Sequence, residues 1–229
     1  MALKFYFDLL SQPVRATYIF LKMNNIKFTP KVVNLGKGEH FTDEFAEVNP
    51  FKRVPVIDDD GFKLTESVAI LQYLAEKHNV PDHWWPKDLN KRAKVNEYMN
   101  WQHYNLRWNG SMVFQHKALI PRLTGRPIDE KKLNSHLKKL DDNLDSLENI
   151  FLRDQPFVAG NEISIADLLC ICELMQPQMA GYNYGETRPK LLKYMSLVQG
   201  QLEPHFDEAH KVLYKMRDMA TKKFGVSKL

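Results

Sequence analysis

The first third of the chain alternates short apolar runs with segments of helical periodicity. The aromatic-rich run LKFYFD over residues 3–8 predicts a strand, and Pro13 suits the first turn of a helix that continues to about Met23. The pattern then predicts strands over residues 26–34, 54–58 and 62–64, and helices over residues 42–48 and 66–78. The resulting order, β-α-β-α-β-β-α, is typical of a thioredoxin-like domain with a small mixed sheet and helices on its faces.

From Leu89 onward the hydrophobic positions follow helical periodicity alone. Prolines and glycines divide this part into five predicted helical segments, over residues 90–120, 129–153, 164–180, 188–199 and 203–220. Pro81 and the segment His83-Trp84-Trp85-Pro86 interrupt both patterns. The sequence therefore predicts an α/β thioredoxin-like domain over residues 1–79, a linker over residues 80–89 and an all-α domain over residues 90–229.

Composition and charge agree with a soluble globular protein and argue against several other classes. Hydrophobic residues make up 44% of the chain and charged residues 26%, enough for a packed core. The net charge of +4 is not gathered into a dense basic stripe, so a nucleic-acid partner is not expected. No run reaches the length of a membrane span, and Lys4 and Asp8 interrupt the amino-terminal apolar run, which argues against a secretory signal. We expect a cytoplasmic protein.

The two cysteines do not predict metal or redox chemistry. Cys170 and Cys172 form neither a CxxC pair nor a Cys/His cluster with zinc-ligand spacing. Two free, buried thiols in a reducing compartment are the simplest interpretation. We expect no metal site and no redox cofactor.

Two helix starts carry polar residues whose purpose the local pattern leaves open. Ser11 follows the first predicted strand and precedes the helix that begins near Pro13, while Glu66 and Ser67 begin the helix over residues 66–78. Such residues commonly cap a helix. The positive end of a helix also suits an anionic ligand. From these residues alone, capping and ligand binding remain open.

Four segments considered together resemble the glutathione transferases, and in particular their serine-using, theta-like class. They are Asp8-Leu-Leu-Ser-Gln-Pro13, Asn49-Pro-Phe-Lys-Arg-Val-Pro-Val56, Leu64-Thr-Glu-Ser-Val-Ala-Ile70 and Ile163-Ser-Ile-Ala-Asp167. The stretches LLSQPVRA, TESVAILQYL and YMNWQHYNLR carry the theta-like character. The resemblance covers residues 3–220 and implies the glutathione transferase fold.

The resemblance implies a role for each residue of a glutathione cradle. Ser11 would donate a hydrogen bond to the glutathione sulfur and, with the helix end, stabilise the thiolate without attacking the substrate itself. Val54, held by a cis bond to Pro55, would pair with the cysteinyl backbone of glutathione. Glu66 would receive the γ-glutamyl ammonium group, and Ser67 the carboxylate.

Three further residues are candidates on the same ground. The resemblance implies that His40 and Arg53 bind the glycyl carboxylate of glutathione. Arg107 would approach the electrophile and bind a sulfate or halide leaving group, although a salt bridge explains an arginine there equally well. Some relatives supply an acid from the partner subunit near position 104, where this chain has Tyr104. Some also carry a long carboxy-terminal helix over the site, so a more open pocket is expected here.

The implied function is glutathione conjugation in detoxification. The thiolate would attack small alkyl or aralkyl halides or epoxides, with peroxidase activity on organic hydroperoxides as a further expectation. Glutathione is then a cosubstrate, no cofactor is needed, and a homodimer is implied. A non-catalytic binding protein of the same fold is the alternative, whereas a thiol-disulfide enzyme would need a cysteine near position 11.

Two further short motifs concern helix structure and cellular location. Ser164 and Asp167 match a helix-capping box and predict structure rather than chemistry. The final tripeptide, Ser227-Lys228-Leu229, matches a peroxisomal address. This tripeptide therefore predicts a peroxisomal share of the protein beside the cytoplasmic one.

Overall fold

The computed structural model describes residues 3–185, 187–224 and 227–228, and its first half is a four-stranded mixed sheet. The strands are β1 (Leu3–Phe7), β2 (Phe28–Val32), β3 (Val56–Asp59) and β4 (Phe62–Thr65), in the order β2-β1-β3-β4. β1 runs parallel to β2 and antiparallel to β3, which in turn is antiparallel to β4. This arrangement confirms the thioredoxin-like prediction.

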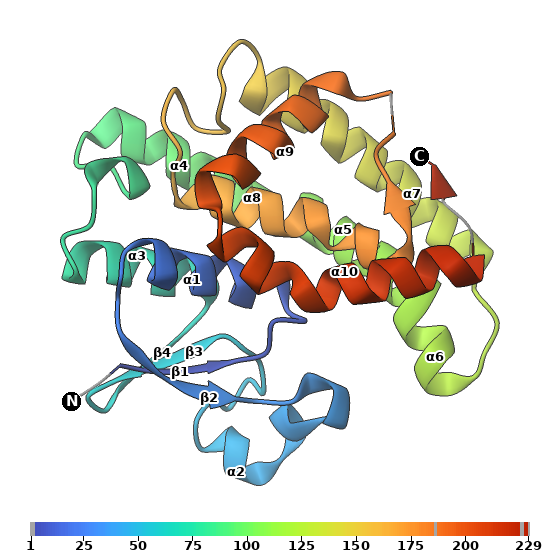
Figure 1. Ribbon diagram of the computed structural model, residues 1–229, viewed down its shortest axis with the longest axis horizontal. Helices are drawn as coiled ribbons and strands as arrows, with labels where there is room; N and C mark the ends of the chain where they lie inside the picture. Colours follow the sequence, from blue (N-terminus) through green and yellow to red (C-terminus); the bar gives the residue numbers. More distant parts are fainter. Residues whose placement is uncertain (1–2, 186, 225–226, 229) are drawn as a thin grey trace.

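Helices α1 (Gln12–Met23) and α3 (Ser67–Lys77) lie between this sheet and the helical half of the molecule (Figure 1). Every residue of α1 from Gln12 to Leu21 is buried, because the helix packs against α3, α8 (Ile165–Met175) and α10 (His205–Phe224). The other face carries the connection from β2 to β3, with η1 (Leu35–Lys37), η2 (Glu39–Phe41) and the single-turn helix α2 (Asp43–Ala46). α1 is therefore shared between both halves of the fold.

The second half is built mainly from helices. They are η3 (Asp82–Trp84), α4 (Leu89–Gln102), α5 (Leu106–Phe114), η4 (Gln115–Leu119), α6 (Ile120–Thr124), α7 (Glu130–Ser146), η5 (Leu147–Leu152), α8 (Ile165–Met175), η6 (Pro177–Ala180), α9 (Pro189–Leu202) and α10 (His205–Phe224). Within the described ranges, none has both the length and the apolar character needed to cross a membrane.

The predicted helix over residues 90–120 is broken between α4 and α5. Asn105 leaves the helical region with φ −109° and ψ −102°, and its side-chain amide donates to the carbonyl of Trp101 at 2.7 Å. An asparagine side chain that bonds its own backbone competes with helix continuation in this way. The break lets α5 start in a new direction.

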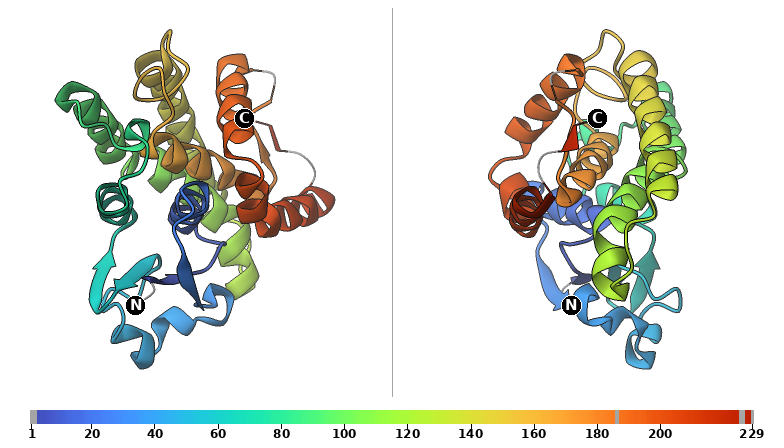
Figure 2. Two further views of the ribbon diagram at one scale, coloured as in Figure 1. Left: turned by 60° about the vertical axis from the view of Figure 1, so that its left-hand side comes forward. Right: turned by 90° about the vertical axis from the view of Figure 1, so that its right-hand side faces the viewer.

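Helix α8 is the centre of the helical half, with α7 on one side and α9 and α10 on the other (Figure 2). All its residues are buried. Its start confirms the predicted capping box, since Asp167 Oδ2 accepts from the Ser164 backbone at 2.9 Å and Ser164 Oγ accepts from the Ala166 backbone at 3.3 Å. Burial raises the pKa of Asp167 to about 6, against the opposing effect of its hydrogen bonds.

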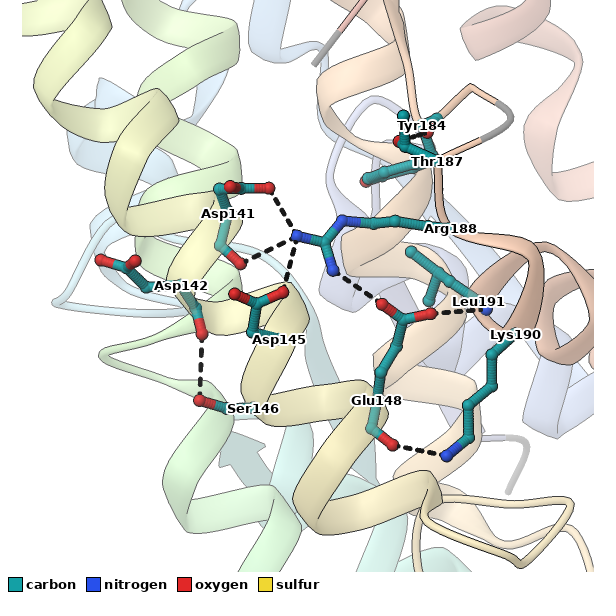
Figure 3. A network of polar contacts seen from close by, with 10 residues as sticks. All are labelled: Asp141, Asp142, Asp145, Ser146, Glu148, Tyr184, Thr187, Arg188, Lys190 and Leu191. Carbon is teal, nitrogen blue, oxygen red and sulfur yellow. Dashed lines mark hydrogen bonds and ion pairs between the residues drawn. The ribbon is translucent and has the colours of Figure 1, made fainter.

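An ion cluster around Arg188 attaches the start of α9 to α7 and η5 (Figure 3). The Arg188 guanidinium lies 2.5 Å from Asp141, 2.9 Å from Asp145 and 2.7 Å from Glu148. Glu148 also accepts from the Leu191 backbone at 3.1 Å. A planar guanidinium can meet several carboxylates at once, so one side chain joins two sequence-distant helices.

The prediction of an all-helical region over residues 90–229 needs one correction. Two-residue strands β5 (Tyr182–Asn183) and β6 (Ser227–Lys228) pair in parallel. Strands this short have no periodicity of their own, so only a long-range backbone pairing reveals them. The first two residues of the proposed peroxisomal tripeptide thus lie in β6, whereas Leu229 lies outside the described residues.

Candidate functional site

The register of the sheet brings three separate candidate segments to one edge. Tyr6 of β1 faces Val56 of β3, and Val56 faces Thr65 of β4. Because neighbouring strands here are antiparallel, the residues after β1, before β3 and after β4 lie at the same end of the sheet. This end carries Ser11, the Val54–Pro55 pair and the Glu66–Ser67 pair.

Ser11 occupies the N-cap position of α1, with φ −86° and ψ 125°, but its side chain makes no capping hydrogen bond. The backbone of the residue is well held, since Ser11 N donates to Asp8 O at 3.0 Å and Arg15 N donates to Ser11 O at 3.1 Å. The capping interpretation is therefore wrong for this hydroxyl. It stands at the positive end of α1 and remains available to a ligand.

The turn that carries Ser11 is fixed from two sides. Asp8 accepts from the backbone of Leu10 at 3.0 Å and of Leu35 at 2.9 Å. Arg15, which is fully buried, donates to the carbonyls of Leu9 at 2.9 Å and Leu10 at 3.2 Å. The position of Ser11 is thus set by hydrogen bonds on both sides of the turn.

The start of α3 has two features typical of a ligand site. Glu66 is exposed and has φ 66°, a left-handed backbone that is uncommon for a residue with a side chain. Ser67 is 3% exposed, and its Oγ has no hydrogen-bond partner among the described residues. A buried hydroxyl without a partner is costly unless a ligand supplies one. The Val54–Pro55 bond is cis, as the resemblance implied.

The candidates for the glycyl carboxylate lie around the loop before β3. His40 is in η2, its Nδ1 is buried without a partner in the described part of the chain, and burial lowers its pKa. The Arg53 side chain is exposed, while its carbonyl accepts from Asn49 at 2.7 Å. Lys52 donates to Phe41 O at 2.9 Å, which places the loop against η2. Lys52 was missed by the sequence analysis.

Arg107 lies outside this cradle, on the helical side of the boundary between the two halves. Its Nε is 3.7 Å from a carboxylate oxygen of Glu173, so the predicted salt bridge exists. One turn further along α5, Ser111 accepts from the side chain of Gln12 at 2.5 Å. Since Gln12 is the neighbour of Ser11, this face of α5 lies next to the Ser11 turn.

His103 links the two regions electrostatically. Burial is the main cause that lowers the pKa of His103; the positive charge of Arg107 lowers it further, whereas the carboxylate of Glu66 raises it. His103 therefore lies near both the start of α3 and Arg107. The sequence analysis missed His103, Gln12 and Glu173. Only Glu173 has a visible signal in the sequence: it is an acid inside an otherwise apolar helical run.

Neither cysteine lies where it could serve a glutathione cradle. Both Cys170 and Cys172 are fully buried in α8, and burial raises the pKa of each thiol to about 12. Thiol-disulfide chemistry needs an accessible thiolate. These side chains are packing residues. No group of three His, Cys, Asp or Glu side chains able to hold a metal is found within the described residues.

Comparison with known proteins gives one consistent result. Two family models match, glutathione S-transferase, N-terminal domain, over residues 3–76 and glutathione S-transferase, C-terminal domain, over residues 112–201. The chain is 48% identical over 219 residues to glutathione S-transferase theta-1 of Bos taurus, which covers 95% of this chain and 91% of the relative. It is 42% identical over 224 residues to glutathione S-transferase theta-2 of Mus musculus, covering 97% and 91%.

Solved structures agree with the sequence relatives. Human glutathione-S-transferase T1-1 in its apo form matches with a TM-score of 0.91 at 47% identity, covering 94% of this chain and 91% of that one. A human theta-class glutathione transferase in complex with the glutathione conjugate of 1-menaphthyl sulfate matches with a TM-score of 0.92 at 39% identity, covering 100% and 94%.

Proposed function

The chain belongs to the glutathione S-transferase family, and from that premise we propose that Ser11 activates glutathione for attack on small electrophiles. Glutathione conjugation in detoxification is the activity of this fold and sequence class. The observation that supports Ser11 most directly is its hydroxyl at the start of α1 without a capping bond.

The proposed role of Ser11 is electrostatic. A free thiol has a pKa of about 8.5, so only a few per cent is thiolate at neutral pH. A hydrogen bond from the Ser11 hydroxyl, added to the partial positive charge of the helix end, stabilises the thiolate and lowers that pKa. The sulfur then attacks the electrophilic carbon, a C–S bond forms, and the leaving group departs with the electron pair of its broken bond.

The rest of the cradle would bind the remainder of glutathione. Val54 next to cis-Pro55 would pair with the cysteinyl backbone as an added strand does. The buried Ser67 hydroxyl and the start of α3 suit the γ-glutamyl carboxylate, and exposed Glu66 suits the ammonium group. His40, Arg53 and the neighbouring Lys52 would face the glycyl carboxylate.

The electrophile is proposed to lie along α5. Arg107, Ser111 and Phe114 are spaced at i, i+4 and i+7, so they share one face of that helix. Ser111 contacts Gln12 beside Ser11, and Phe114 lines a groove of about 570 Å³ that also includes Met179 and Met216. An apolar substrate body would fit that groove while Arg107 meets the leaving group.

Replacement of Ser11 by alanine tests the central assignment. We expect glutathione binding to survive, turnover to fall about 100-fold, as for removal of one preorganised donor, and the thiol pKa of the bound complex to rise. Thiolate absorbance against pH measures the last effect. Ser146→Ala, which removes an exposed hydroxyl bonded to Asp142 O at 3.0 Å, is the control. Unchanged turnover in Ser11→Ala would refute the role.

Peroxidase activity is a second proposal for the same thiolate. Two glutathione molecules would reduce one organic hydroperoxide to an alcohol and water and leave as the disulfide. The same activated sulfur would attack the peroxide oxygen, so Ser11→Ala should lower this rate as well. A cumene hydroperoxide assay coupled to disulfide reduction measures it, and activity that persists in Ser11→Ala would assign the reaction to another group.

We also propose that the protein forms a homodimer and is distributed between the cytoplasm and peroxisomes. The dimer is supported by large apolar side chains on the surface, among them Tyr104 at 86% and Trp108 at 51% exposure. Sedimentation velocity tests it, and a monomer at micromolar concentration would contradict it.

The proposed cytoplasmic and peroxisomal location is supported by the sequence. Imaging of the intact protein against a variant lacking Ser227 to Leu229 tests the peroxisomal share.

A further inference from the structure

Glu173 is a buried acid whose carboxylate lacks a hydrogen bond of good geometry among the described residues, although the side chain of Gln12 lies near enough to oppose the rise that burial causes in its pKa. It lies on α8 and is 1% exposed, and both its oxygens are buried without a hydrogen-bond partner among the described residues. Burying a charge without hydrogen bonds raises the free energy of the folded state, and packing alone does not offset that cost. The presence of an acid at this place therefore needs an explanation other than the stability of the core.

The nearest cation is Arg107, at 3.7 Å between Nε and Oε1. The Arg107 side chain is 24% exposed, so it extends from the buried carboxylate toward the surface of α5. Its two Nη groups donate no hydrogen bond within the part of the chain that the structure describes. The guanidinium is thus attracted to the carboxylate at its Nε, and its Nη donors are unpaired among the described residues.

The surroundings place this pair next to the start of α1, where Ser11 lies. Gln12, next to Ser11, donates to Ser111, one turn from Arg107 on α5. On the other side, Arg15 Nη2 lies 3.3 Å from Cys172 O and 2.7 Å from Gln176 Oε1, so α1 is attached to α8 on both sides of Glu173 in the sequence. The start of α1, the face of α5 with Arg107 and the carboxylate of Glu173 therefore meet at one place.

We propose that Glu173 is a positioning residue, which holds the Arg107 guanidinium by its Nε edge so that the Nη groups receive an anionic leaving group. The inference rests on the proposed function, because it assumes an electrophile beside the glutathione sulfur. In the reaction the thiolate forms a C–S bond, the bond from carbon to the sulfate oxygen breaks, and its electron pair leaves with sulfate. The two Nη groups form the pair of donors that a sulfate accepts.

The arrangement explains why an acid is kept in the core. A flexible arginine side chain loses much of its rotamer freedom when it binds an anion. An opposing charge behind it limits that freedom before the substrate arrives, and burial makes the attraction stronger than it would be in water. Burial raises the pKa of Glu173 to about 7, with Arg107, Gln12 and Arg15 acting in the opposite direction. At pH 8 the carboxylate is mostly charged.

The first experiment compares two electrophiles that share one arylmethyl group, a sulfate ester and a chloride, at pH 8. We expect Glu173→Gln to lower kcat for the sulfate ester by about 10- to 100-fold, the larger figure being the effect of a misplacement of about 1 Å. The chloride should be affected less than about 2-fold, since one halide has no pair of oxygens to meet the two donors. KM for glutathione should not change. An equal fall for both electrophiles would overturn the proposal and indicate a structural role.

A double-mutant cycle separates an effect through Arg107 from a direct one. In an Arg107→Ala background, Glu173→Gln should cause no further change in the sulfate-to-chloride ratio, because the group that it positions is gone. A further fall of that ratio would contradict the proposal. Glu173→Asp keeps the charge and should retain more of the ratio than Glu173→Gln.

The control for protein integrity is Glu148→Gln. Glu148 is also a mostly buried acid paired with an arginine, Arg188, at 2.7 Å. Its replacement should lower the melting temperature without changing the sulfate-to-chloride ratio. Failure of the proposed function is visible separately, because the wild-type protein would then conjugate neither electrophile with glutathione.

Discussion

Replacement of Arg15 by methionine tests whether the Ser11 turn depends on the helical half of the molecule. The Arg15 guanidinium is fully buried and donates to four oxygens, those of Leu9, Leu10 and Cys172 on the backbone and Oε1 of Gln176. Two of these acceptors belong to the turn before α1 and two to α8 and the residue after it. Methionine keeps most of the volume and removes every donor.

The expected loss follows from the acceptors left behind. A buried oxygen without a partner costs about 1–3 kcal/mol. The Leu9 and Leu10 carbonyls are partly accessible and regain water, so the main cost falls on Cys172 O and Gln176 Oε1. Desolvation of the guanidinium, which lowers the pKa of Arg15, is removed in the variant and offsets part of this cost. We expect a net destabilisation of about 3 kcal/mol, or about 6–12 °C in melting temperature for a chain of this size.

Urea unfolding followed by tryptophan fluorescence measures the change. Lys22→Met on the same helix is the matched control, because the Lys22 side chain is 35% exposed and its contact with Glu208 is 3.7 Å long. That exposed pair should contribute less than about 1 kcal/mol. Arg15→Lys keeps the charge but not the fork of donors and should lie between the two. If Arg15→Met destabilised the protein no more than Lys22→Met, the assigned role of Arg15 would be refuted.

Three further predictions concern other buried polar groups. Arg188→Ala should cost about 2 kcal/mol in urea unfolding, because Glu148 at 13% exposure loses its partner while the exposed Asp141 and Asp145 lose little; no change would show that the cluster in Figure 3 does not contribute to stability. The pKa of Glu173 is raised from 4.5 to about 7 in the folded state, so its stabilising contribution is complete below pH 4.5 and is lost as pH rises through 7, by about 3 kcal/mol at the upper end. Glu173→Gln lacks this loss, so its melting temperature relative to wild type should increase from pH 5 to pH 8, and a flat difference would contradict the shift. Ser67→Ala should weaken glutathione binding about 10-fold by calorimetry yet stabilise the unliganded protein by about 1 kcal/mol, because the buried hydroxyl has no partner in the described part of the chain; destabilisation instead would show that the fold already satisfies it.

The sequence alone identified the elements whose signals are local. The strand over residues 3–8, the helix that begins after Ser11 and the capping box of Ser164 and Asp167 were predicted from periodicity and helix-start residues, and the structure contains all three. The resemblance in four short segments named the family, which the comparisons confirmed. These features depend on neighbours a few residues apart, so a linear pattern records them.

Some features were missed because their cause is a contact between distant segments. The break at Asn105 and the pairing of β5 with β6 have no periodicity that marks them. Arg15 and Glu173 are charged residues, which a local pattern places at the surface, yet both are buried. Arg15 is buried because α1 lies between the sheet and α8. Glu173 is buried because α8 is covered on all sides.

The candidate site shows the same division. The sequence supplied Ser11, Val54, Pro55, Glu66 and Ser67 as residue types suited to glutathione, but the local pattern left capping as the commoner explanation for Ser11 and as an open one for Ser67. The antiparallel register of β1, β3 and β4 decided that these residues share one edge. The tertiary structure also showed that, among the described residues, the Ser11 hydroxyl makes no capping bond and the buried Ser67 hydroxyl has no hydrogen-bond partner. Sequence determines which groups are present and how each segment folds locally, whereas only packing between segments decides which polar groups remain without a partner and are therefore free to bind a substrate.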